Sequence, residues 1–460
     1  MPVRLEARSG KDEPVRAGTV RGESRLLFAS MVFAAVPMIE LTALGANGAL
    51  LAALAALLQL GSALLILILL WPAARLWKGV APTLLVLLAG LGWACLPEFA
   101  GSLGWSASLP WGPAVRFVPD LLLANICRYL GTIASLVAGV TIGYRRGLMR
   151  TAVDWLIVFG MINALTGLVL REIDPVHIWG LDKNIHRFRF TGTLQNANAA
   201  ACIFGVIALL AAARLWVSID TLRGSRGSGA MSVLLLNVVA VAVGFGACLI
   251  TGSRATLMLT LLGLAWLGLA AFRDRAAASG TRWISPVAIG AGCLAMLALF
   301  GGLTLNRMEG LAGGSENRWV IWQHYWRLAV REPVYGYGLG SFSDMNLHFL
   351  SSREDALSFA YINAAHNHLL QLLLAGGWPF LASQIVALGL MVIPILRSRR
   401  REHHDPVFSG MWLGLAVIGG CSMIDIALAV PAILTMAATL TGLLWGRSLR
   451  LKHESTASLQ

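Results

Sequence analysis

The stretch GALLAALAALLQLGSALLILILLW, residues 48–71, carries no charged side chain along its whole length. An α-helix rises about 1.5 Å per residue, so a run of this length crosses the roughly 30 Å hydrocarbon core of a bilayer. Comparable apolar runs lie near 26–44, 80–97, 118–143, 151–170, 197–217, 230–250, 255–272, 284–304, 367–396, 408–428 and 430–446. The runs predict an all-α polytopic membrane protein with about twelve transmembrane helices.

The overall composition excludes the soluble globular class. Apolar residues make up 57% of the chain and charged residues 13%, and the mean hydropathy is +0.71. The runs lack the alternation of apolar and polar residues that barrel strands show, and in lipid a helix satisfies its own backbone hydrogen bonds. The six cysteines all fall in or beside apolar runs, so neither a disulfide framework nor a clustered thiolate metal site is indicated.

Basic residues cluster in every second connection between the runs. The clusters are Arg4 to Arg25, Arg75/Lys78, Arg145/Arg146/Arg150, Arg223/Arg226, Arg273/Arg275/Arg282, Arg397/Arg399/Arg400/Arg401 and Arg447/Arg450/Lys452. By the positive-inside rule, these connections and both termini face the cytoplasm. The net charge of +13 is then a topology signal, and nucleic-acid binding is not expected.

The remaining connections belong on the opposite face of the membrane. They lie near 98–117, 171–196, 251–254 and 305–365. The expected organisation is a cytoplasmic N-terminal segment, a first set of membrane helices, one large outer loop with short helices, a second set of membrane helices and a cytoplasmic tail. The corresponding ranges are 1–25, 26–304, 305–365, 366–446 and 447–460.

The outer loop contains one clearly predicted helix. Ser315 can cap its start, and Trp319, Trp322 and Trp326 then recur on a single helical face. Tryptophan favours the depth of the membrane interface, so we expect this face to lie against the membrane or the bundle. Pro333 cannot continue the helix and ends it.

A glycine-rich segment, YGYGLGSF, follows at 335–342. It predicts a tight turn. The alternative is that the segment binds phosphate, although the strand-then-helix context of a nucleotide-binding loop is missing.

Arginines on the outer face are the strongest indication of a binding site. Arg254 lies in a connection too short to be a solvated loop, and Arg189 and Arg318 lie on the same side of the membrane. A guanidinium group donates paired hydrogen bonds to phosphate and stays charged. The alternatives are snorkelling or lipid-headgroup contact, and Arg187 competes with Arg189 for the role. Arg128, within an apolar run, is expected to pair with Asp120 or with a backbone carbonyl.

The order of several short motifs resembles the O-antigen ligase superfamily. The motifs are TGTLQNAN at 191–198, SRA at 253–255, Arg318 with Trp322, Pro333 with GYGLGSF at 336–342, and HNHLLQ at 366–371 with a glycine pair at 376–377. Together they cover roughly residues 185–380, and the N-terminal runs are similar to the family only in being hydrophobic.

The resemblance implies a bacterial inner-membrane glycosyltransferase whose outer loop and active site face the periplasm. Such an enzyme moves a glycan from undecaprenyl pyrophosphate to lipid A–core oligosaccharide, with both substrates and the membrane lipids as its partners. No cofactor or metal is expected, because fixed arginines can stabilise the pyrophosphate leaving group. A polysaccharide polymerase of the same superfamily is the alternative, and a lipid-linked glycan transporter is a further one.

Within this reading, His366 is the candidate general base. Neutral imidazole can accept the proton of an acceptor hydroxyl near neutral pH. A structural role at a helix start is the alternative, with His368 or the carboxylates of Glu354 and Asp355 as other candidate bases. Arg189, Arg254 and Arg318 are the expected pyrophosphate ligands, and Asn198, Trp322, Asn367 and His368 are expected to support the site.

Overall fold

The computed structural model describes residues 17–46, 48–103, 122–183, 186–224, 228–279, 311–399 and 405–457. Eleven helices in these ranges are long and apolar enough to cross a membrane. They confirm the prediction of an all-α polytopic membrane protein. The predicted span at 284–304 lies outside the described residues.

The N-terminal half consists almost entirely of helices. In chain order these are α1 (Ala17–Thr42), the 3-10 helix η1 (Leu44–Ala46), α2 (Ala49–Leu70), α3 (Ala74–Ser102), α4 (Leu122–Tyr144), α5 (Leu148–Ile173), α6 (Ala197–Gly224), α7 (Ser228–Thr251) and α8 (Arg254–Ser279). Between α5 and α6 a small antiparallel hairpin pairs β1 (His177–Ile178) with β2 (Leu181–Asp182).

The C-terminal half begins with an excursion of three helices and then returns to long spans. The excursion comprises α10 (Leu311–Arg331), α11 (Phe342–His348) and α12 (Arg353–Phe359). The spans that follow are α13 (His368–Arg399), α14 (Pro406–Ile424) and α15 (Pro431–Ala457), with the 3-10 helix η4 (Ala427–Ala429) between the last two.

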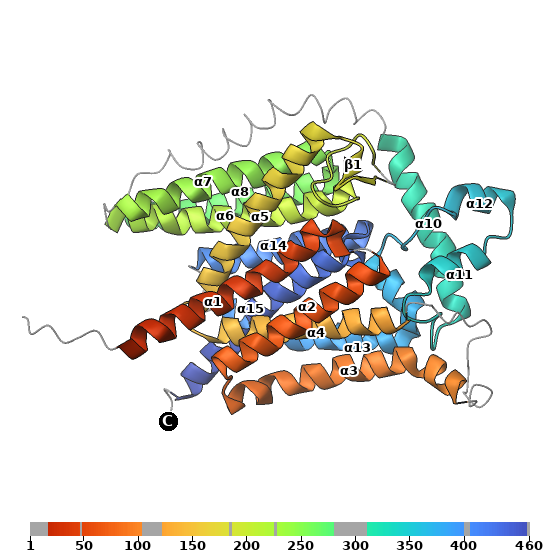
Figure 1. The fold of residues 1–460 in the computed structure, drawn as a ribbon, viewed down its shortest axis with the longest axis horizontal. Helices are drawn as coiled ribbons and strands as arrows, with labels where there is room; N and C mark the ends of the chain where they lie inside the picture. Colours follow the sequence, from red (N-terminus) through yellow and green to blue (C-terminus); the bar gives the residue numbers. More distant parts are fainter. Residues whose placement is uncertain are drawn as a thin grey trace, which may run out of the picture.

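The two ends of the bundle differ in character. Helices α10, α11 and α12 lie together at one end, which we call the loop end, and the start of α1 and the C-terminus lie at the other (Figure 1). Successive spans alternate in direction, so basic clusters such as Arg145/Arg146/Arg150 and Arg447/Arg450 gather at that second end, which we call the basic end. The arrangement is the one that the positive-inside rule requires. Which end faces the cytoplasm stays a prediction.

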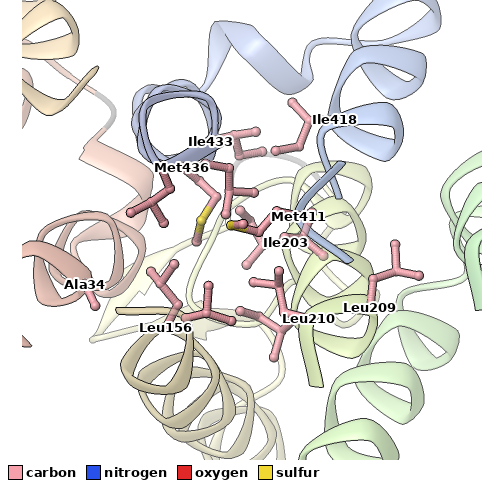
Figure 2. Close-up of a cluster of buried hydrophobic side chains, with 14 of the residues drawn as sticks. Ala34, Leu156, Ile203, Leu209, Leu210, Met411, Ile418, Ile433 and Met436 are labelled. Atoms are coloured by element: carbon pink, nitrogen blue, oxygen red, sulfur yellow. The ribbon is translucent and has the colours of Figure 1, made fainter. Parts of the chain in front are cut away.

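The hydrophobic core centres on α6, with α5, α14 and α15 around it. Figure 2 shows Leu156 of α5, Ile203 and Leu210 of α6, Met411 of α14 and Met436 of α15 packed together. Buried alanines along α6 allow the surrounding helices to approach closely. They are Ala197, Ala199, Ala200, Ala201, Ala208, Ala211 and Ala213.

Helix α15 packs against α4 through two glycines on each helix, Gly139 and Gly143 on α4 and Gly442 and Gly446 on α15. A Cβ atom added at Gly143 would overlap the backbone of Leu443, and one at Gly446 would overlap the backbone of Val140. Small residues at this spacing permit close backbone contact between membrane helices. The contact holds the middle of α15 against the last turns of α4, toward the basic end.

The end of α14 differs from the prediction. The apolar run was expected to continue to residue 428, but α14 ends at Ile424 and Asp425 adopts an extended conformation. Pro431 begins α15, and Val430 before it is extended, as a residue preceding proline prefers. The break places a buried carboxylate at the loop end.

The helix of the outer loop also begins earlier than predicted. Helix α10 begins at Leu311, so Ser315 lies inside it and the predicted N-cap is wrong. Capping needs a nonhelical residue at the cap position, and here the preceding residues are already helical. The end at Arg331, before Pro333, is as predicted. Helix α10 packs with α11, α12 and the start of α13 through a second apolar cluster that includes Tyr325, Phe342 and Leu373.

The glycine-rich segment docks the excursion onto a break in α13. The N–H of Tyr337 donates to the carbonyl of Leu374 at 2.7 Å, and the N–H of Trp378 donates to the carbonyl of Pro333 at 2.8 Å. Gly336 and Gly377 both have positive φ, and a Cβ at either position would overlap backbone atoms of the other segment. These contacts give the segment the structural role of a tight turn.

Candidate functional site

Asp425, in the break between α14 and α15, is the centre of a polar cluster at the loop end. Its side chain is 9% exposed. Oδ2 accepts hydrogen bonds from Nδ2 of Asn198 at 2.7 Å and from Nη2 of Arg318 at 3.1 Å. Oδ1 accepts from the N–H of Ile426 at 2.8 Å. One carboxylate therefore joins the start of α6 to the excursion helix α10.

His366 reaches the same carboxylate from the segment that re-enters the bundle. Its Nδ1 lies 3.4 Å from Oδ1 of Asp425, a close polar contact without hydrogen-bond geometry, and its side chain is 26% exposed. His366 has a φ of 53°, a left-handed conformation that is uncommon outside glycine. Nε1 of Trp322 donates to the carbonyl of His366 at 3.1 Å and helps to hold this conformation.

Asn367 fixes the helix that follows. Its Oδ1 accepts from the N–H of Leu370 at 3.1 Å, which is an N-cap bond for α13. Its Nδ2 donates to the carbonyl of Met423 at 3.0 Å, next to the end of α14. Asn367 is thus a structural link between His366 and the break that carries Asp425.

Asp425 is negatively charged at neutral pH. Burial by itself raises the pKa of its carboxyl group. The contact with His366, the N–H of Ile426 and the charge of Arg318 outweigh burial, and the pKa lies below its ordinary value of 3.8. The carboxylate can therefore orient an imidazole and stabilise its positive charge.

Arg189 extends the cluster through Asn198. Its Nη2 lies 3.4 Å from Oδ1 of Asn198 and 2.9 Å from the carbonyl oxygen of Thr251, to which Nε also donates at 3.1 Å. Arg187 is exposed, and its Nε donates to the carbonyl of Lys183 at 3.3 Å. Of the two arginines that compete in the sequence, Arg189 is the one linked to Asp425 through Asn198.

The TGT part of the first motif anchors this loop in the bundle. Thr191 and Thr193 are buried, and the hydroxyl of Thr193 donates to the carbonyl of Leu41 at 2.8 Å. Nδ2 of Asn163 donates to the same hydroxyl at 3.0 Å. The motif therefore acts by positioning Arg189 and Asn198 on either side of it.

Arg254 begins α8, beyond the turn that contains Thr251. It is partly exposed, and among the described residues its side chain makes no hydrogen bond or ion pair. Arg254 thus lies at the loop end near Arg189, whose guanidinium donates to the carbonyl of Thr251. Within the described part of the chain, Arg254 itself makes no bond to the Asp425 cluster.

His368 occupies a different position from His366. It is the first residue of α13, within electrostatic reach of Arg128. Nη2 of Arg128 donates to the carbonyl of Ala429 at 2.9 Å, so the predicted carbonyl partner is confirmed, whereas Asp120 lies outside the described residues. The carboxylates of Glu354 and Asp355 lie in the first turn of α12, and Asp355 bonds to Ser351 and Ser352.

Two residues of this region were missed in the sequence. Asp425 is the single acid within the apolar run 408–428, and an ionisable residue inside such a run is the signal that could have identified it. His186 is the second: its Nδ1 accepts from the N–H of Ala197 at 3.2 Å. Burial, followed by the charge of Arg189, lowers the pKa of His186 although Asp425 acts in the opposite direction.

The cluster combines an imidazole, a carboxylate and guanidinium groups at one end of a membrane bundle. Arginine forks suit phosphate oxygens, and a guanidinium has five N–H donors, of which Arg318 uses one with Asp425. An imidazole held against a carboxylate through Nδ1 has Nε2 as its second nitrogen for proton transfer. The arrangement is suited to binding an anionic group next to a group that gives up a proton.

Comparison with known proteins supports the resemblance to the O-antigen ligase superfamily. Residues 239–385 match the family model described as O-antigen ligase, a range that includes Arg254, Arg318 and His366. Asn198 and Asp425 lie outside that range. A search of curated proteins finds no match. Members of the matched family are ligases and polymerases that act as glycosyltransferases. The resemblance seen in the motifs is confirmed: this multi-pass membrane protein contains an O-antigen ligase domain at residues 239–385.

Proposed function

We propose that the protein is an O-antigen ligase that transfers a glycan from undecaprenyl pyrophosphate to lipid A–core oligosaccharide. The transfer takes place at the periplasmic face of the bacterial inner membrane, as a step of lipopolysaccharide biosynthesis. The observation that carries the proposal is the pairing of both Arg318 and His366 with Asp425 at the loop end. The pairing brings a phosphate-binding group and a proton acceptor to one carboxylate.

Arg189, Arg254 and Arg318 hold the pyrophosphate of the donor. Arg318 is 37% exposed and keeps donors beyond the one that bonds Asp425, and the side chain of Arg254 is partly exposed. Fixed guanidinium groups stabilise the negative charge that grows on the leaving pyrophosphate as the glycosidic bond breaks. Because the donor is lipid-linked, its tail lies in the bilayer while its pyrophosphate reaches the loop end.

His366 removes the proton from the acceptor hydroxyl. The hydroxyl oxygen attacks the anomeric carbon of the donor sugar, the bond from that carbon to the pyrophosphate oxygen breaks, and the proton moves to Nε2 of His366. Undecaprenyl pyrophosphate leaves with the electron pair. Asp425 holds Nδ1 of His366 and stabilises the imidazolium that forms. No step is assigned to a metal ion.

Deletion of the gene tests the assignment and separates it from the polymerase alternative. Loss of a ligase leaves lipid-linked glycan of normal chain length accumulating while lipid A–core stays unmodified. Loss of a polymerase leaves single repeat units, still joined to lipid A–core. A deletion strain with the second phenotype would contradict the ligase assignment, and restoration by the wild-type chain but not by a His366→Ala chain would support it.

A further inference from the structure

A second basic site lies at the basic end, away from the Asp425 cluster. The turn between α4 and α5 and the last turns of α15 line an open cavity of about 200 Å³. Five arginines and one glutamate line it, together with Gly147 and Met149; the charged residues are Arg145, Arg146, Arg150, Arg447, Arg450 and Glu454.

The carboxylates nearby do not balance these arginines. Arg146 pairs with Glu454 at 2.9 Å, and Nε of Arg450 lies 3.7 Å from the same carboxylate. Arg447 and Arg150 share Asp405, the N-cap residue of α14, at 2.6 and 3.5 Å. Among the described residues, five guanidinium groups therefore face two carboxylates, and these side chains together carry a net positive charge.

Arg145 shows how the excess charge is held in place. Its Nη2 donates to the carbonyl of Leu70 at the end of α2 and lies 3.4 Å from the carbonyl oxygen of Trp71. These partners carry no formal charge, so the guanidinium is fixed without being neutralised. A positive group held in this way keeps its attraction for an anion.

The start of α5 adds to the positive potential. Gly147 lines the cavity and is the N-cap residue of α5, with a φ of 85° and no side-chain cap. The first N–H groups of a long helix carry a partial positive charge and bind phosphate readily. The cavity also lies at the basic end, where the spans α4, α5 and α15 have their ends, and membrane spans are expected to meet lipid headgroups at their ends.

We propose that this cavity binds the phosphate group of an anionic ligand, supplied either by a phospholipid headgroup or as free phosphate. Its volume suits a phosphate with a small substituent, and the arginines donate to the phosphate oxygens. Glu454, the carboxylate that lines the cavity, weakens binding by repelling the anion. The site is separate from the proposed transfer reaction and does not depend on it.

Two probes with the full-length protein test this site. Native mass spectrometry of protein from nanodiscs with phosphatidylglycerol in phosphatidylcholine counts the retained anionic lipid, and calorimetry in pure phosphatidylcholine nanodiscs measures binding of inorganic phosphate. Retained phosphatidylglycerol without phosphate binding identifies the headgroup as the source. Phosphate binding that competes with the lipid identifies free phosphate. If the protein binds neither phosphatidylglycerol nor phosphate, the proposal is wrong.

Variants locate the binding. Arg146→Gln with Arg150→Gln should lower retention or affinity at least roughly tenfold, since two charge-assisted contacts are lost. Arg273→Gln with Arg397→Gln removes the same charge from the basic end outside the cavity and should match the wild type. Glu454→Gln should increase binding, and this prediction holds even if the double arginine variant does not fold. Equal binding in both double variants, or no increase with Glu454→Gln, would overturn the site.

Discussion

His366 and Asp425 meet at the loop end with Nδ1 of the imidazole 3.4 Å from Oδ1 of the carboxylate. The two residues come from different parts of the fold, one before α13 and one in the break between α14 and α15. Asp425 also bonds Arg318 and Asn198 through its other oxygen. One buried carboxylate thus links a candidate base to a candidate phosphate ligand. Substitutions can test the role of the base and the role of the phosphate ligand separately.

Asp425→Asn should lower the turnover rate more than it weakens donor binding. The amide keeps the size of the side chain but loses the charge that stabilises the imidazolium, while Arg318 is released to bind the donor. We expect kcat to fall roughly 10²- to 10⁴-fold, the range for loss of a group that orients a catalytic histidine, with KM for the donor unchanged or lower. Asp344→Asn, on the exposed face of α11, is the matched control. An unchanged kcat would remove Asp425 from the mechanism.

Arg254→Ala and Arg318→Ala should each reduce transfer by roughly 10²- to 10³-fold, as expected for loss of one preorganised charge-stabilising donor. The Lys variants should restore only part of the rate, because an ammonium group cannot form the paired bonds of a guanidinium. Arg187→Ala, an exposed position in the same outer loop as Arg189, should remain active. Full activity of the Lys variants would indicate general attraction to headgroups instead.

Acid should loosen the loop that carries Arg189. The N–H of Ala197 donates to Nδ1 of His186, so this nitrogen must be unprotonated. Burial, with Arg189, lowers the pKa of His186 in the folded protein, so the open loop takes up a proton first. Neutral His186 stabilises the folded loop fully when the pH is above the ordinary pKa of histidine, about 6.5. This stabilisation declines as the pH falls below that value.

Hydrogen exchange of residues 186–197 in nanodiscs, corrected for intrinsic rates, measures this effect. Protection should be equal at about pH 8 and pH 7 and weaker at about pH 5.5. The pH dependence should vanish in His186→Gln, whose side-chain oxygen can accept the same bond. Stronger protection in acid would contradict the assignment.

Cysteine labelling tests the orientation of the bundle. In a background without the native cysteines, Leu357→Cys and Tyr361→Cys place thiols on exposed positions of the excursion, and Arg397→Cys places one at the basic end. An impermeant reagent applied to intact spheroplasts should label the first two and spare the third, because the basic end is expected to face the cytoplasm. The reverse pattern would place the proposed site on the side where lipid-linked precursors are made.

The spans could be read from the sequence because insertion into lipid depends on local composition. Runs such as 48–71 need no long-range partner to become helices. The helix end at Ile424 and the start of α10 were misplaced, since both depend on neighbouring residues that composition describes poorly.

The candidate site was only partly predictable for a different reason. His366 and Arg318 were recognised from motifs, but nothing in their spacing places a carboxylate from a later helix break between them. The choice between Arg187 and Arg189 likewise depends on Asn198 and Thr251, which the fold brings to Arg189. The matched family range ends before Asp425, so the motif order could not reveal it.

The most direct test of the proposed mechanism is transfer by purified protein with lipid-linked donor and lipid A–core acceptor. His366→Ala should bind the donor as the wild type does and lose turnover, because the acceptor hydroxyl then has no base. His368→Ala, at the neighbouring start of α13, should keep substantial activity. If folded and inserted His366→Ala transfers glycan at the wild-type rate, His366 is not the base and the central claim is wrong.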